Sequence, residues 1–154
     1  MSGTLTLRNR QRTRALDLRL LRRIIRALLQ DLLGREHFDL GFYFVGAPEM
    51  TRVNETFLQH AGSTDVITFD YNDPAQPEHL AGEIFVCVDE ALLQARRFRT
   101  TWQSEVVRYV VHGVLHLSGY DDLQAQARRQ MKRAENRLVK QLGRQFYLPK
   151  TALP

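Results

Sequence analysis

The chain has 154 residues, 44% of them hydrophobic and 25% charged, which fits one globular domain over 1–154 and excludes a disordered or fibrous protein. No apolar run approaches the roughly 20 residues of a membrane span, and one cysteine excludes an internal disulfide, so we expect a cytoplasmic protein without a membrane partner. The net charge of +5, from 19 arginines and only 3 lysines on the basic side, favours a nucleic-acid partner, because guanidinium groups pair two-pronged with phosphate.

The first third of the chain alternates predicted strands and helices. Residues 4–10 alternate apolar and polar side chains and predict a strand, and residues 16–33 carry an apolar stripe at helical spacing. Gly34 is a typical helix stop. The aromatic run 38–45 predicts a second strand, and a proline at its first position predicts a helix over 48–60.

The remainder predicts two strands followed by helices. The β-branched run 64–71 is typical of a strand, and 82–89 predicts another strand after a proline-bearing loop over 72–79. Apolar periodicity predicts three further helices, at 89–98, 103–118 and 123–143. This order predicts an α+β fold: a single small domain with a mixed sheet of about four strands packed with helices.

One segment, HGVLHLSGYDD, stands out for its chemistry. His112 and His116 are four residues apart in a predicted helix, so both imidazoles lie on one face. Gly119 can end the helix and turn the chain, which brings Asp122 back towards the histidines. The spacing therefore predicts a metal site at the end of a helix, with His112, His116 and Asp122 as ligands.

Two imidazoles and one carboxylate suit a single zinc ion that keeps one position open for water or substrate. Ordinary helix-face histidines are the alternative, but they do not explain the glycine turn and the carboxylate. Zinc peptidases with similar spacing carry a glutamate directly after the first histidine as general base, and this chain has Gly113 there. The motif thus indicates a catalytic metal site that lacks the peptidase base.

The motif is very similar to the H-G-x-L-H-L-x-G-Y-D-H signature of the YbeY family, the bacterial metal-dependent endoribonucleases of ribosomal RNA maturation. The resemblance extends over most of residues 40–140. Its other matching positions are Val53-Asn54, Thr64 to Phe69, Gly82-Glu83-Ile84, Glu105, Met131 and Glu135.

The resemblance implies a zinc-dependent endoribonuclease specific for single strands. It further implies a role in ribosomal RNA processing, namely maturation of the 3′ end of 16S ribosomal RNA, and in ribosome quality control. The implied partners are a single-stranded ribosomal RNA precursor and the ribosome or its small subunit.

This chain departs from the family pattern at two positions. Asp122 replaces the commoner third histidine, and the neighbouring Asp121 is an alternative ligand. Leu58 replaces an arginine that the family places at the RNA or the active site. Other cations must then contact the RNA, and the candidates are Arg52, Arg96, Arg97 and Arg99.

The sequence does not assign a general base. Gly113 cannot serve, and the carboxylates near matching segments are Glu83, Asp65, Asp70 and Asp121. Two alternatives to a nuclease remain. One is a zinc peptidase, and the other is a non-enzymatic RNA-binding factor of ribosome assembly whose metal only stabilises the fold. A structural zinc usually has four protein ligands, and the motif offers three.

Overall fold

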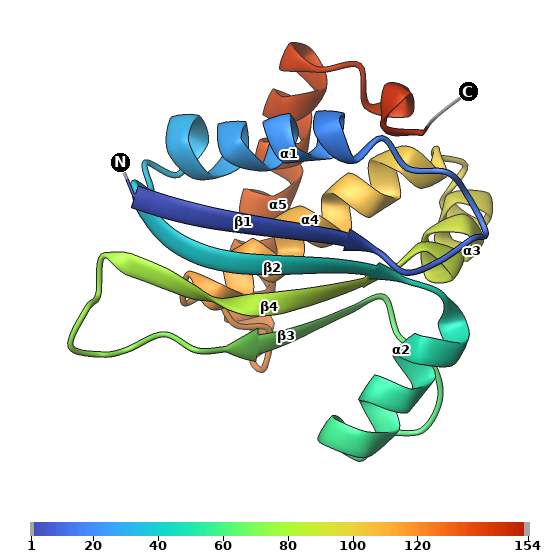
Figure 1. The fold of residues 1–154 in the computed structure, drawn as a ribbon, viewed down its shortest axis with the longest axis horizontal. Helices are drawn as coiled ribbons and strands as arrows, with labels where there is room; N and C mark the ends of the chain where they lie inside the picture. Colours follow the sequence, from blue (N-terminus) through green and yellow to red (C-terminus); the bar gives the residue numbers. More distant parts are fainter. Residues whose placement is uncertain (1, 153–154) are drawn as a thin grey trace.

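Four strands pair in the order β1-β2-β4-β3 to form one sheet (Figure 1). The computed structural model describes residues 2–152. Strands β1 (Ser2–Asn9), β2 (His37–Val45) and β4 (His79–Cys87) run parallel, and β3 (Val66–Asp70) pairs antiparallel with β4. Within the described residues, no helix is both long and apolar enough to cross a membrane.

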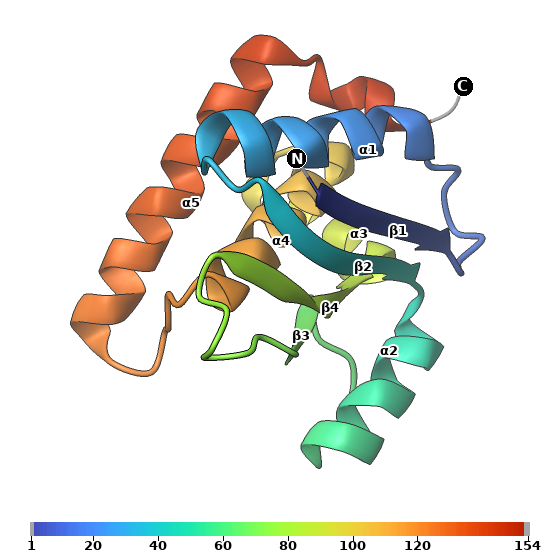
Figure 2. The same ribbon diagram turned by 60° about the vertical axis from the view of Figure 1, so that its left-hand side comes forward.

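Most of the helices pack on one face of this sheet, as Figures 1 and 2 show together. They are α1 (Leu18–Arg26) with its π-helical continuation η1 (Ala27–Leu32), α3 (Val88–Phe98), α4 (Trp102–Leu117), α5 (Ala125–Gln145) and the short 3₁₀ helix η3 (Leu148–Thr151). Helix α2 (Ala47–Val53), continued by η2 (Asn54–Leu58), lies at the opposite face, where Met50 and Val53 pack in a smaller cluster with Ile67.

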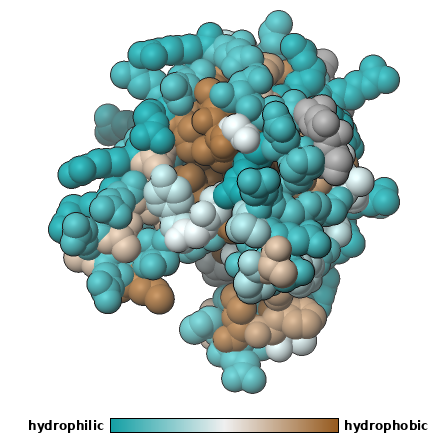
Figure 3. Space-filling view, turned by 90° about the vertical axis from the view of Figure 1, so that its left-hand side faces the viewer, coloured by the Kyte–Doolittle hydropathy of each residue, from teal (hydrophilic) through white to brown (hydrophobic). Residues whose placement is uncertain are grey.

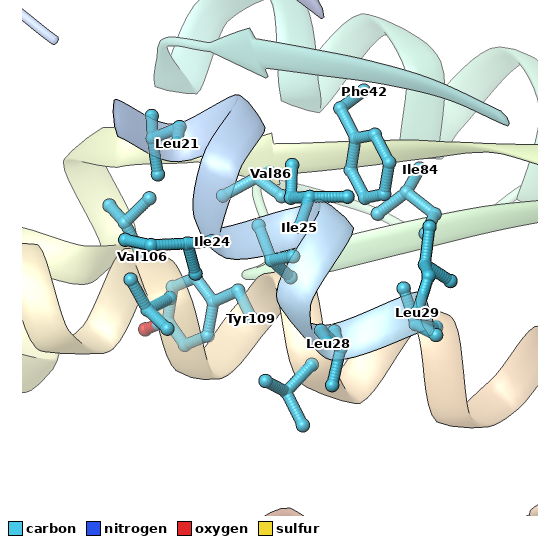
Figure 4. Packing of buried hydrophobic residues seen from close by; sticks show 14 of the residues in the cluster. Leu21, Ile24, Ile25, Leu28, Leu29, Phe42, Ile84, Val86, Val106 and Tyr109 are labelled. Atoms are coloured by element: carbon cyan, nitrogen blue, oxygen red, sulfur yellow. The ribbon is translucent and has the colours of Figure 1, made fainter. Parts of the chain in front are cut away.

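The main core lies between the sheet and helices α1 and α4. Figure 4 shows Ile25 of α1 and Leu29 of η1 beside the sheet residues Phe42, Ile84 and Val86. All five side chains are fully buried. Tyr109 of α4 lies on the other side of α1 in this view. Alternate residues of each strand enter this core, as a sheet with one covered face requires. Burial of so much apolar surface stabilises α4, the helix that carries both predicted metal-binding histidines.

The predicted fold class is confirmed, including the order of the elements and the number of strands, but several boundaries were wrong. The helix predicted over 16–33 begins at Leu18, because the Asp17 carboxylate caps it by accepting from the Leu20 amide at 3.1 Å. Leu16 instead forms an isolated bridge with Ala152.

The strand predicted over 82–89 lies at 79–87, and the loop before it spans 71–78 where 72–79 was predicted. It ends early because Val88 and Asp89 already belong to α3. The Asp89 carboxylate there accepts from the Ala47 amide at 2.6 Å and so joins α3 to the start of α2. The short helix Leu148–Thr151 was not predicted at all.

Gly82 is required where α4 and β3 approach β4 most closely. A Cβ atom at this position would lie 2.6 Å from the Phe69 carbonyl oxygen and 2.8 Å from Leu117 Cδ1. Because one of these neighbours is backbone, Gly82→Ala is expected to destabilise the chain by about 1–3 kcal/mol, measurable by urea denaturation. The matched control is Gly143→Ala in α5, where the nearest atom is 4.0 Å away. That change should stabilise by about 0.5 kcal/mol, and a neutral Gly82→Ala would contradict the close approach.

Candidate metal centre

His112 and His116 lie one turn apart on α4, near its carboxyl end. Thr101 caps the start of this helix by accepting from the Ser104 amide, and a mostly apolar sequence buries ten of its residues. The two imidazole rings form a T-shaped, edge-to-face pair with centroids 4.8 Å apart. After Leu117 the helix stops, and Gly119, with φ of +105°, turns the chain back.

This turn brings Asp122 to the two histidines. Its Oδ2 atom lies 3.6 Å from Nε2 of His116, and one ligand atom from each of the three side chains lies within 4.8 Å of the others. The set of two imidazoles and a carboxylate fits zinc, and all three side chains are partly exposed, so solvent or substrate can reach them. Asp121 instead accepts from the Leu123 amide at 3.1 Å, within the turn.

Glu135 of α5 orients the first histidine. Its Oε1 lies 2.7 Å from Nδ1 of His112, while Oε2 accepts from Arg108 at 2.6 Å and from Lys132 at 3.0 Å. Burial alone would raise the pKa of Glu135, but these hydrogen bonds outweigh it and lower the pKa to about 2. The ionised carboxylate thus holds Nδ1 and leaves Nε2 for a ligand, as second-sphere carboxylates do in zinc sites.

A cavity of about 540 Å³ opens next to these groups, between α3, α4 and α5. Four kinds of side chain line it, one of them the carboxylates of Asp65, Glu105 and Glu135. The ligand candidates His112 and Asp122 lie at one side, and apolar groups form much of the wall. The cations that line it are Arg108, Arg128, Arg129 and Lys132. Such a mixture suits a ligand with both phosphate groups and flat apolar surfaces.

The arginines expected to contact RNA are not part of this cavity. Arg96, Arg97 and Arg99 are exposed at the end of α3, and Arg52 is exposed on α2, which both ribbon views place away from α5 (Figures 1 and 2). The four cations that do line the cavity were missed. Three of them form a run at 128, 129 and 132 on the helix that follows Asp122, whereas Arg108 lies on α4 and has no such signal.

The carboxylates that are candidates for the general base lie at different sites in the structure. Gly82 faces Leu117 of α4, so its neighbour Glu83 projects from the opposite face of the sheet, where it accepts from the Tyr71 hydroxyl at 2.7 Å. The structure therefore does not bring Glu83 to the histidines. Asp70 lines a different cavity, whereas Asp65 lines the same one as His112.

The structure also places Gly113 and Leu58. Gly113 faces β4, where a Cβ atom would lie 2.7 Å from Ile84 Cγ2, so no side chain fits at the position of the peptidase glutamate. Leu58 lies at the end of η2 and is 40% exposed, next to Phe57, which is 65% exposed. Figure 3 shows hydrophobic residues gathered at the low end of the molecule, over this segment.

Comparison with known proteins places the chain in a family. A family model described as endoribonuclease YbeY matches residues 6–143. The endoribonuclease YbeY of Chlorobium luteolum is 37% identical over 131 residues, which cover 85% of this chain and 93% of that protein. The endoribonuclease YbeY of Salinibacter ruber is 32% identical over 133 residues, which cover 82% of this chain and 84% of that protein.

The fold also matches a solved structure. The solution structure of TM1509 from Thermotoga maritima superposes with a TM-score of 0.65 over 90% of this chain and 89% of that one, at 23% identity. This likeness concerns the fold alone. Because the family model spans 6–143 and the relatives exceed 30% identity over most of both chains, the chain belongs to the YbeY family of endoribonucleases.

Proposed function

We propose that this chain is a zinc-dependent endoribonuclease that cuts single-stranded RNA, with one ion held by His112, His116 and Asp122. The observation that carries the proposal is the meeting of these three ligand atoms, within 4.8 Å of one another, at the side of a cavity lined by four cations. The relatives named endoribonuclease YbeY support RNA as the substrate class.

A zinc ion in such a set supplies Lewis-acid stabilisation to a phosphate oxygen and acidifies water. The side chains of the protein do the rest. Arg128, Arg129 and Lys132 are exposed at the cavity and hold RNA phosphates, and their contribution to binding should weaken as salt rises. Glu135 fixes the ring of His112, and the nearby Arg108 keeps that carboxylate ionised.

We extend the proposal to the cellular substrate on the strength of the family. The RNA is then a ribosomal precursor, the reaction belongs to 16S 3′-end maturation and ribosome quality control in the cytoplasm, and the small subunit is the partner. Single-stranded RNA suits a cavity with apolar walls, because unstacked bases can enter it.

Asp65 is the proposed proton acceptor, since it alone of Glu83, Asp65, Asp70 and Asp121 lines the cavity beside His112. Its Oδ1 accepts from the Val66 amide at 2.8 Å, which holds the carboxylate in place. Asp65→Asn should lower kcat by about 10²-fold, with zinc content and RNA affinity unchanged. Asp70→Asn is the control, because Asp70 lines a separate cavity, and its kcat should stay near wild type. A kcat within threefold of wild type for Asp65→Asn would remove this role.

The direct test is cleavage of a labelled single-stranded ribosomal RNA fragment by the zinc-loaded chain, with and without a chelator. Zinc-dependent cutting supports the proposal, and the product ends identify the nucleophile. A 2′,3′-cyclic phosphate indicates attack by the RNA 2′-hydroxyl, and a 5′-phosphate indicates water. Tight, salt-sensitive RNA binding without cleavage by the metallated chain would favour the assembly factor instead. Zinc-dependent digestion of casein would revive the peptidase.

A further inference from the structure

The cavity beside His112 extends beyond the residues that the proposed reaction uses. Its walls include the rings of Phe98 and Tyr109 and the side chain of Met131. Tyr109 and Met131 are buried, whereas Phe98 is 64% exposed. Asp65 and Glu105 line the same cavity as that ring, and burial together with these two carboxylates raises the pKa of Tyr109. Flat apolar walls of this kind suit a planar, partly apolar group.

Glu105 is the unusual group in this cavity. It is only 7% exposed, and its Oε1 accepts from the Thr100 hydroxyl at 2.7 Å. Within residues 2–152, no side chain or backbone group forms a hydrogen bond or ion pair with Oε2. Among the described residues only Thr151 Oγ1 is both fully enclosed and without a partner, so Oε2 of Glu105 keeps some opening, and Glu105 lines this cavity. A carboxylate oxygen with so little solvent around it offers a bound N–H group a strong acceptor.

The exposed cations of the cavity and its buried acceptor Glu105 lie on different helices, and Asp65 adds an exposed acid. Arg128, Arg129 and Lys132 are exposed on α5, whereas the acceptor Glu105 lies buried on α4. A ligand fits both the cations and Glu105 if one end is negatively charged and lies in solvent, while the other end is flat, carries a hydrogen-bond donor and lies inside the cavity. A nucleotide has this form, because its phosphates meet the cations while its base enters between the rings.

Resting on the proposed ribonuclease function, we propose that this cavity takes the base of a nucleotide next to the scissile phosphate. Glu105 then selects bases that carry an amino group on the Watson–Crick edge. At position 4 cytosine donates from its amino group, whereas uracil presents a carbonyl oxygen that meets the carboxylate with like partial charge. The only donor on the Watson–Crick edge of uracil is N3–H, which lies beside that oxygen. Cytosine should therefore bind better than uracil, although the two rings have the same size.

The difference has an expected size. A hydrogen bond to a charged group that is present for one base and absent for the other separates the affinities by about 10-fold or more. Glu105→Gln keeps the shape and the bond from Thr100, but its amide can donate to the uracil carbonyl. In this variant the preference for cytosine should fall to within about threefold.

The experiment measures the affinity of the full-length chain for fluorescently labelled hexamers of cytidine and of uridine by anisotropy. One series contains a chelator, so that the RNA stays intact, and a parallel series contains zinc. Glu78→Gln is the matched control, because it removes the same charge from the exposed loop before β4. A third hexamer carries 2-pyrimidinone, which is cytosine without its 4-amino group, and tests the wild type alone.

Three results support the inference: tighter binding of the cytidine hexamer, loss of that preference with 2-pyrimidinone, and its loss in Glu105→Gln but not in Glu78→Gln. Equal affinities for the cytidine and uridine hexamers in the wild type overturn it, as does an unchanged preference in a folded Glu105→Gln. Absence of RNA cleavage in the zinc series would reject the proposed reaction while the binding series still decides the base selection.

Discussion

Replacement of His116 by alanine is expected to abolish stoichiometric zinc binding and to lower the rate of RNA cleavage by about 10³-fold or more. Loss of one of three ligands leaves a two-ligand site, and the several kcal/mol of charge stabilisation that zinc supplies corresponds to about three powers of ten in rate. The His116 side chain is 26% exposed, so its removal should leave the fold intact. Zinc content by mass spectrometry and single-turnover cleavage of labelled RNA measure both effects.

His60→Ala is the control for this change, because His60 is exposed beyond η2 and is not among the three clustered ligand candidates. It should retain zinc and full activity. Cleavage that persists in zinc-free His116→Ala would show that the metal assignment is wrong. Asp122→Asn, compared with Asp121→Asn, separates the two possible carboxylate ligands, and only the change at 122 should weaken zinc binding.

The parts of the fold that sequence reasoning predicted are those that local spacing controls. Helix α4 follows from its apolar periodicity, and the meeting of His112, His116 and Asp122 follows from one helical turn and one glycine turn within eleven residues. The strands also follow from local patterns. The predicted ends of the strands were less accurate. At the end of β4, for example, Asp89 already belongs to α3, where its carboxylate accepts a hydrogen bond from the distant Ala47 amide.

The parts that were missed depend on contacts between distant segments. Glu135 lies 23 residues after His112, on another helix, and nothing local to either residue indicates that the two side chains meet. The face of β4 on which Glu83 lies depends on how Gly82 meets Leu117, 35 positions further along. The cavity cations on α5 likewise depend on how that helix packs against α4.

Glu135 is the position where a change outside the ligand set should matter most. Glu135→Gln should weaken zinc binding by about 10- to 100-fold, because the carboxylate that holds Nδ1 of His112 becomes a neutral amide. Glu135→Ala should also destabilise the metal-free chain, by about 3 kcal/mol, since it removes the shared acceptor of a buried ion-pair network. Zinc titration and urea denaturation give the two quantities.

The pH dependence of stability offers a second measure of the same carboxylate. The pKa of Glu135 lies at about 2 in the folded chain, below its ordinary value of 4.5. A lowered folded-state pKa means that the stabilisation is complete above about pH 4.5 and is lost as pH falls towards 2. Over this window the metal-free wild type should lose stability more steeply than Glu135→Gln, as followed by urea midpoints at each pH.

Glu83→Gln is the matched control for both measurements, because Glu83 bonds to the Tyr71 hydroxyl on the opposite face of the sheet. Its zinc affinity should equal that of wild type. Equal zinc affinities of Glu135→Gln and wild type would mean that the bond to Nδ1 does not support metal binding. In that case Glu135 acts only through Arg108, which joins α5 to α4, and through Lys132 on its own helix. Loss of stability without loss of zinc affinity thus separates a role in packing from a role in orienting His112.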